Sequence, residues 1–136
     1  MDRLFTYGTL MIPEVIDTVL GRPAGCASHA ELPDYACFRV RNCQFPAILA
    51  ASGHATHGRL YQDIAPTAFQ RLDLYEGALY QRCRVCVRLD DGRSLDAWTY
   101  VLHGRYRAQL TRESWDYEYF VSRQLEGFLK RLRGSA

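Results

Sequence analysis

The sequence predicts an α+β fold in which an antiparallel sheet or small barrel is packed by two or three helices. Segments that alternate between apolar and polar residues occupy the middle of the chain, and segments with apolar residues at helical spacing lie before, between and after them. With 136 residues, of which 48% are hydrophobic and 24% charged, the chain can bury a core without a metal or a disulfide. A single domain over residues 1–136 is therefore expected.

The chain is predicted to open with a strand, a glycine turn and a helix. Residues 4–7 form a short apolar, β-prone run that Gly8 interrupts. Pro13 is favourable in the first turn of a helix, and Gly21 predicts where that helix ends. The apolar side of this helix carries Val15, Ile16, Val19 and Leu20.

Short strands joined by turns are predicted between residues 24 and 64, where Gly, Pro and Asn interrupt the chain. The apolar runs in this region are too short for helices, and they comprise residues 36–40, 47–50 and 58–61. Pro46 fits a turn or an edge strand, because proline cannot donate a hydrogen bond to a central ladder. His54 and His57 lie among Ser, Gly and Ala, a composition that predicts a solvated loop.

The second half of the chain is predicted to contain a helix, a hairpin and a final helix. Residues 66–75 place apolar side chains three residues apart, at Phe69, Leu72 and Tyr75. Residues 80–89 and 95–101 alternate as strands do, and Asp91-Gly92 between them is a hairpin signal. Residues 112–133 are predicted to form the final helix, with acidic residues near its start and basic residues near its end. Its core-facing side is predicted to carry Trp115, Tyr119, Leu125, Phe128, Leu129 and Leu132.

The charge distribution argues against a polyanionic partner. A net charge of +2 results from 17 basic and 15 acidic residues that are interspersed, without the basic stripe that nucleic-acid binding uses. No run approaches the roughly 18 apolar residues of a membrane span, and the first residues lack the apolar core of a signal peptide. We therefore expect a cytoplasmic protein, a monomer or weak homodimer, that binds neither nucleic acid nor membrane.

The five cysteines are an odd number without the spacing of a disulfide framework, which indicates buried thiols in a reducing compartment. Cys83 and Cys86 are three residues apart in a predicted strand, so their side chains point to opposite faces, which disfavours a shared metal. No metal site is expected. A thiol-dependent enzyme that uses either cysteine is a weaker alternative.

Glu76 is a candidate proton acceptor, because it directly follows the helix predicted over residues 66–75. A carboxylate at that end faces the negative end of the helix dipole, and burial by its neighbours disfavours ionisation further, so both effects raise its pKa. The neighbours predicted to bury it are Leu74, Tyr75, Leu79 and Tyr80. The alternative interpretation is a surface glutamate before a capping glycine, Gly77.

Tyr7-Gly8-Thr9-Leu10 is a candidate anion-binding loop. If the glycine turn opens a helix, the successive amides of Gly8, Thr9 and Leu10 are free to bind a carboxylate without a cationic side chain. The alternative interpretation is an ordinary glycine turn after a strand.

Three motifs occur in order along most of the chain: LFTYGTLM at residues 4–11, GRLY at residues 58–61 and LDLYEGALYQR at residues 72–82. Together they resemble the γ-glutamylcyclotransferase-like family, in particular its AIG2-like branch. The resemblance implies a small mixed, mostly antiparallel β-barrel with flanking helices. It also implies that Glu76 is the catalytic residue and that the glutamyl moiety is held by Tyr7, Gly8, Thr9 and Leu10.

The chemistry that the resemblance implies is intramolecular. The α-amine of a γ-glutamyl amine or amino-acid conjugate attacks its own γ-carbonyl, giving 5-oxoproline and a free amine, with Glu76 as general acid and base. No metal or cofactor is then required. The alternative is a non-catalytic module on the same fold that binds a small carboxylate.

Two further features of the chain concern the pocket that the resemblance implies. Residues 11–13 are Met-Ile-Pro where many relatives have a basic residue and glycine. Phe45-Pro46-Ala47 resembles the family's aromatic-Pro segment, and both this segment and Tyr80 fit either pocket lining or packing.

Overall fold

Five strands close into a barrel in the computed structural model, which describes residues 2–134. Around the barrel the order is β1, β3, β2, β4, β5. All neighbours are antiparallel except β1 and β5, which run parallel where Leu4 lies opposite Trp98. This mixed barrel confirms the predicted fold class. The strands are β1 (Asp2–Thr6), β2 (Ala27–Arg39), β3 (Pro46–Ile64), β4 (Tyr80–Leu89) and β5 (Ser94–Leu102).

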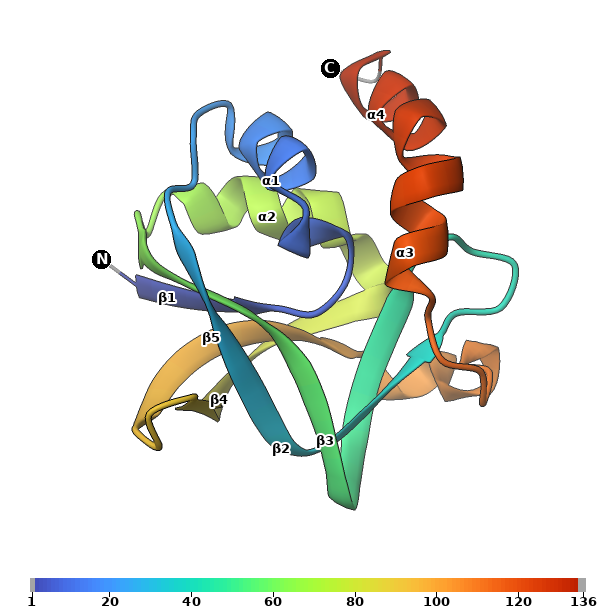
Figure 1. Cartoon of the computed structure of the whole chain (residues 1–136). Coiled ribbons are helices and arrows are strands. Elements are labelled where there is room, and N and C mark those ends of the chain that lie inside the picture. Colours follow the sequence, from blue (N-terminus) through green and yellow to red (C-terminus); the bar gives the residue numbers. More distant parts are fainter. Residues whose placement is uncertain (1, 135–136) are drawn as a thin grey trace.

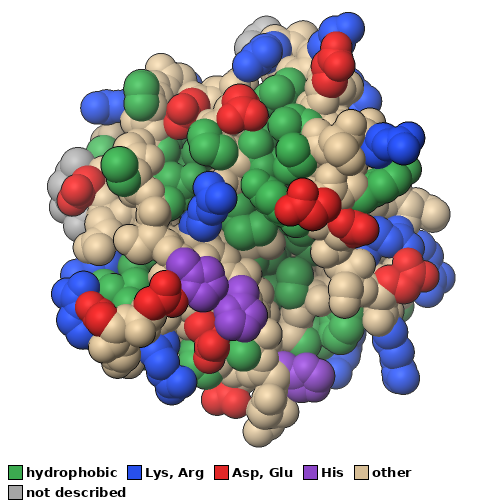
Figure 2. Space-filling model, viewed as in Figure 1, with side chains coloured by type: hydrophobic (Ala, Val, Ile, Leu, Met, Phe, Trp, Pro, Cys, Tyr) green, Lys and Arg blue, Asp and Glu red, His purple; other side chains and the backbone are tan. Residues whose placement is uncertain are grey.

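Helices cover one end of the barrel and one of its sides (Figure 1). Helices α1 and α2 lie together above the barrel, and the C-terminal helix rises beside them. On the face shown in Figure 2, hydrophobic side chains gather in the middle, and acidic and basic side chains are interspersed around them. The α-helices are α1 (Pro13–Leu20), α2 (Ala68–Glu76), α3 (Tyr117–Tyr119) and α4 (Leu125–Gly134), with a π-helical turn, η4 (Phe120–Gln124), between the last two. The 3-10 helices are η1 (Thr9–Met11), η2 (Gly77–Leu79) and η3 (Gly104–Gln109).

The core has two main layers because side chains alternate along the strands. On β1, Leu4 faces the helices and Phe5 faces the barrel interior. The layer between barrel and helices includes Leu4, Val15, Ile16, Phe69, Leu72 and Phe120. The barrel interior includes Phe5, Leu32, Ile48, Leu60 and Val87. No helix in the described part of the chain is both long and apolar enough to span a membrane.

Gly58 allows β1 and β3 to approach closely. A Cβ atom at this position would overlap the carbonyl oxygen of Thr6 and lie 2.9 Å from Cζ of Phe5. The neighbouring residue Arg59 pairs with Thr6 in the β1–β3 ladder. Gly58, the glycine of the GRLY motif, is therefore required because β1 and β3 lie too close together for a larger residue.

The strands between residues 24 and 64 are longer than predicted. The short runs belong to two continuous strands, β2 and β3, which pair from Ala27 opposite Tyr61 to Arg39 opposite Pro46. A bulge near Asp34, whose Oδ1 accepts a hydrogen bond from the Gly53 amide at 3.0 Å, bends this hairpin without ending it. Pro46 is the first residue of β3, a position where no ladder donor is needed.

The loop predicted around the histidines is wrong. His54 and His57 are exposed, but both lie on β3, where pairing with β2 overrides the loop-like composition. The ring of His57 stacks on that of His29 from β2, with centroids 5.4 Å apart. These histidines lie on the outside of the barrel.

The final helix begins at Tyr117 rather than at residue 112. Asp116 caps it by accepting a hydrogen bond from the Tyr119 amide at 2.9 Å. The preceding residues are not helical, and the backbone amide of Arg39 on β2 donates to the Glu113 carbonyl at 2.9 Å. Tyr119 is 53% exposed, so its predicted place in the core is wrong, and Phe120 is fully buried instead. The π-helical turn that follows changes the phase of the helix faces.

Candidate active site

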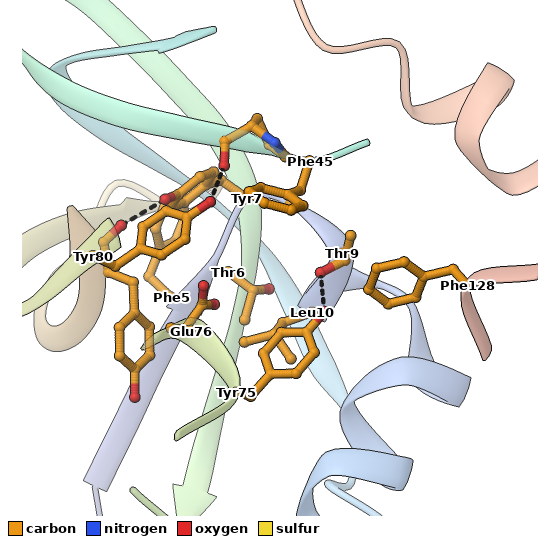
Figure 3. Close-up of a pocket in the computed structure, with 13 residues that line it drawn as sticks. Phe5, Thr6, Tyr7, Thr9, Leu10, Phe45, Tyr75, Glu76, Tyr80 and Phe128 are labelled. Atoms are coloured by element: carbon orange, nitrogen blue, oxygen red, sulfur yellow. Dashed lines mark hydrogen bonds between the residues drawn. The ribbon is translucent and has the colours of Figure 1, made fainter. Parts of the chain in front are cut away.

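A cavity of about 210 Å³ lies between the loop that follows β1, the end of α2 and aromatic side chains from other elements (Figure 3). Of the side chains that line it, only that of Glu76 has an ordinary pKa below about 7. The cavity is lined by Phe5, Thr6, Tyr7, Gly8, Thr9, Leu10, Phe45, Pro46, Tyr75, Glu76, Tyr80, Tyr100 and Phe128.

Glu76 is the last residue of α2, and the helix end determines where its side chain lies. Phe69 and Leu72 are buried on the face of α2 that packs against the core, which fixes the rotation of the helix. Gly77 ends the helix with φ 74°, a backbone conformation that glycine adopts without strain. The carboxyl group points toward the cavity in Figure 3.

The carboxyl group of Glu76 is desolvated and unpaired. Within residues 2–134 it has no hydrogen-bond donor and no ion-pair partner. Burial raises its pKa from an ordinary value of 4.5 to about 8. The predicted direction of the pKa shift is confirmed, and its cause is desolvation. The predicted contribution of Leu74 is wrong, because that side chain is 84% exposed.

The loop after β1 presents unused amide donors. The turn at Gly8 opens the 3-10 helix η1, in which the first helical hydrogen bond runs from the Met11 amide to the Gly8 carbonyl at 3.0 Å. In the described part of the chain, the amides of Gly8, Thr9 and Leu10 have no acceptor. The condition for free amides, a turn that opens a helix, is therefore met.

The hydroxyl groups around the cavity are bonded to the protein itself. The Tyr75 hydroxyl lies 2.6 Å from Oγ1 of Thr9, and the Tyr80 hydroxyl donates to the Pro46 carbonyl at 2.6 Å (Figure 3). Burial raises the pKa of both tyrosines, so both keep their protons at neutral pH. These bonds occupy both hydroxyls and leave the rings as the unbonded part of each tyrosine side chain.

Tyr100 connects the loop to the helix that ends at Glu76. Its backbone carbonyl accepts a hydrogen bond from the Tyr7 hydroxyl at 2.6 Å, and its own hydroxyl donates to Oδ1 of Asp73 at 2.7 Å. Nε of Arg82 donates to the same carboxylate oxygen at 2.9 Å. Asp73 lies one turn before Glu76 on α2. These bonds therefore fix the position of the loop relative to the Glu76 carboxyl group.

Comparison with known proteins identifies a family for this chain. The family model described as gamma-glutamyl cyclotransferase, AIG2-like, matches residues 4–118. The chain belongs to this family. The AIG2-like protein D of Arabidopsis thaliana is 33% identical over 132 residues, which cover 96% of this chain and 86% of that protein.

Solved structures share the fold of this AIG2-like chain. A solution structure of an Arabidopsis thaliana protein has a TM-score of 0.74 at 24% identity, covering 96% of this chain and 87% of that one. A gamma-glutamyl cyclotransferase has a TM-score of 0.65 at 15% identity, covering 97% of this chain and 86% of that one. At these identities the likeness establishes the fold alone.

The structure of this AIG2-like protein brings the predicted site residues together. Tyr7, Gly8, Thr9, Leu10 and Glu76 all line one cavity, and so do the residues for which packing was the alternative, Phe45, Pro46 and Tyr80. Sequence reasoning missed Tyr100 and Phe128, which lie far from the motifs in the chain. Cys83 and Cys86 lie on β4, outside the cavity lining. No group of three or more His, Cys, Asp or Glu among the described residues is placed to hold a metal ion.

Proposed function

We propose that this protein is a γ-glutamylcyclotransferase that converts a γ-glutamyl amine or amino-acid conjugate to 5-oxoproline and a free amine. Glu76 is the general acid and base, and the loop formed by Tyr7, Gly8, Thr9 and Leu10 holds the glutamyl moiety. Membership of the AIG2-like family supports the reaction class. The observation that carries the assignment is an unpaired carboxyl group of raised pKa in a cavity that is also lined by three residues with free backbone amides.

The proposed reaction needs one group that moves protons. Ionised Glu76 takes a proton from the substrate's α-ammonium group, and the freed amine attacks the γ-carbonyl carbon to form the ring C–N bond. The protonated Glu76 then gives its proton to the leaving nitrogen as the original amide C–N bond breaks. Glu76 is then ionised again and takes the second proton from the ring nitrogen, which it passes to the released amine, so that the amine departs as an ammonium ion. The substrate supplies its own nucleophile, so the protein folds it into a reactive shape and excludes water.

The raised pKa suits this double role. A carboxylate of ordinary pKa is a weak acceptor for a proton from an ammonium group. A pKa of about 8 brings Glu76 closer in proton affinity to the substrate's α-amine. Only the ionised form accepts a proton. We therefore expect kcat/KM to rise with pH through about 8, as measured by 5-oxoproline release in buffers of constant ionic strength.

Glu76→Gln tests the assignment, because it keeps the shape of the side chain and removes its basicity. Turnover of a γ-glutamyl substrate is expected to fall by a factor of about 10² to 10⁴. Glu118→Gln is the matched control, since Glu118 is exposed at the start of the C-terminal helix and does not line the cavity. Parent-like 5-oxoproline release by Glu76→Gln would exclude Glu76 as the acid and base.

A panel of γ-glutamyl compounds tests the reaction itself. The parent protein is expected to release 5-oxoproline from at least one member. Saturable binding without product from any member would instead identify a carboxylate-binding module on the same fold.

A further inference from the structure

Two pairs of aromatic rings border the cavity beside Glu76. The rings of Phe45 and Tyr80 have centroids 6.4 Å apart, and those of Tyr75 and Phe128 have centroids 6.5 Å apart. Among the described residues no ring contact joins one pair to the other, although all four rings line the same cavity. In Figure 3, Phe128 reaches the cavity from α4 on the side of Thr9 away from Glu76. The two pairs define a space, called here the aromatic slot.

The aromatic slot offers no partner for a charged leaving group. No Lys, Arg or His is among the residues that line the cavity, and the hydroxyls of Tyr75 and Tyr80 are already bonded to Thr9 and to the Pro46 carbonyl. A carboxylate on the carbon next to the leaving nitrogen would lose its hydration there and meet the negative charge of ionised Glu76. An uncharged ring would instead bury apolar surface against ring faces and edges.

Arg131 is a cation that is hydrogen-bonded to the residue before Phe45. Its Nη2 donates to Oε1 of Gln44 at 2.7 Å, and Gln44 directly precedes Phe45. Arg131 is exposed and does not line the cavity. It is one group that could bind a leaving-group carboxylate outside the aromatic slot, and the experiment below separates that outcome.

We propose that the leaving group is an uncharged arylalkylamine whose ring binds in the aromatic slot between the Phe45–Tyr80 and Tyr75–Phe128 pairs. This inference rests on the proposed cyclotransferase function and specifies its substrate class.

Three conjugates test the substrate class: γ-glutamyl-phenethylamine, γ-glutamyl-ethylamine, which lacks the ring, and γ-glutamyl-phenylalanine, which adds a carboxylate. The phenethylamine conjugate is expected to have a kcat/KM at least about tenfold above each of the others, since both ring burial and the absence of charge favour it. Equal values for the phenethylamine and ethylamine conjugates would overturn the slot. A preference for the phenylalanine conjugate that Arg131→Gln abolishes would assign the leaving-group site to Arg131 instead.

Binding separates failure of the slot from failure of the reaction. Calorimetric titration of Glu76→Gln protein with the same three conjugates reports affinity without turnover. Binding of the phenethylamine conjugate at least about tenfold more tightly than each of the others supports the slot. If the parent protein then releases no 5-oxoproline, only the proposed reaction fails. Equal dissociation constants would overturn the slot whatever the turnover.

Phe128→Ala tests the slot from the protein side. The ratio of kcat/KM, or of affinity, between the phenethylamine and ethylamine conjugates is expected to fall to within about threefold. Phe45→Ala, from a different element, is expected to lower the same ratio and serves if Phe128→Ala does not fold. Tyr119→Ala is the matched control on the C-terminal helix, because Tyr119 is exposed and outside the cavity. An unchanged ratio in both folded slot variants would contradict the proposal.

Discussion

Glu76 is held in an environment that opposes its own charge. A desolvated carboxyl group normally has a hydrogen-bond donor or a cation as its partner, and among the described residues the half-buried Glu76 has neither. Such a group lowers the stability of the folded protein whenever it is ionised. It is therefore a feature that function explains better than folding does.

Glu76 should make the stability of the protein depend on pH. The unfolded chain releases the proton near pH 4.5 and the folded protein near pH 8. Between these values the folded state holds more protons, so stability falls as pH rises through this window. Glu76→Gln removes the penalty and is expected to be more stable than the parent by about 2 to 4 kcal/mol above pH 8, with little difference below pH 4.5.

Urea unfolding of both proteins near the two ends of that pH range measures the effect. The sign of the difference is diagnostic, because most substitutions at a half-buried position destabilise. A stability difference that does not change with pH would mean that Glu76 ionises normally in the folded protein.

Single residues were predictable where their signals are local. Glu76 and the loop around Gly8 are marked by short contiguous motifs, and the structure places both at one cavity. Tyr100 and Phe128 are not marked in this way. One contributes a backbone carbonyl to Tyr7 and the other a ring from the last helix, and neither contact leaves a pattern in the sequence.

At the scale of elements, local signals again decide what was predictable. The glycine after α2 and the turn between β4 and β5 were predicted correctly, because helix caps and tight turns depend on a few adjacent residues. The lengths of β2 and β3 were not, since ladder pairing between distant segments sets them. The start of the final helix was missed for the same reason, because backbone hydrogen bonds with Arg39, which is distant in the sequence, hold the preceding residues out of the helix.

Gly58→Ala is expected to destabilise the barrel by at least about 2 kcal/mol, because the added methyl group overlaps the β1 backbone at Thr6. Thermal or urea unfolding measures the loss. Gly104→Ala is the matched control, since a Cβ atom there meets nothing within 4 Å, and its effect is expected to stay within about 0.5 kcal/mol. Equal stability of the two variants would contradict the close approach of β1 and β3.

At the scale of the whole molecule, helices and barrel share one apolar layer. Leu4 of β1, Phe69 of α2 and Phe120 of the C-terminal helix belong to the same buried cluster. Trp98 packs against Phe69 and Trp115 against Phe120, with centroids 6.4 Å and 5.5 Å apart. Residues from both ends of the chain therefore depend on each other for burial.

Unfolding is expected to be a single cooperative transition. Trp115→Phe leaves Trp98 as the fluorescent reporter of the barrel, and Trp98→Phe leaves Trp115 as the reporter of the C-terminal helix. Within each variant, the fluorescence midpoint in urea is expected to coincide with the midpoint from far-ultraviolet circular dichroism. A C-terminal helix that melts first, seen as an early Trp115 transition, would contradict this coupling.

The walls of the cavity come from residues as far apart as Phe5 and Phe128. During translation the loop around Gly8 leaves the ribosome before Glu76, and the ring of Phe128 emerges after both. The nascent chain thus exposes Glu76 and the Gly8 loop to water before Phe128 can cover them. Contacts between residues so far apart in sequence slow folding. The cavity around Glu76 is therefore complete only after Phe128 has been synthesised.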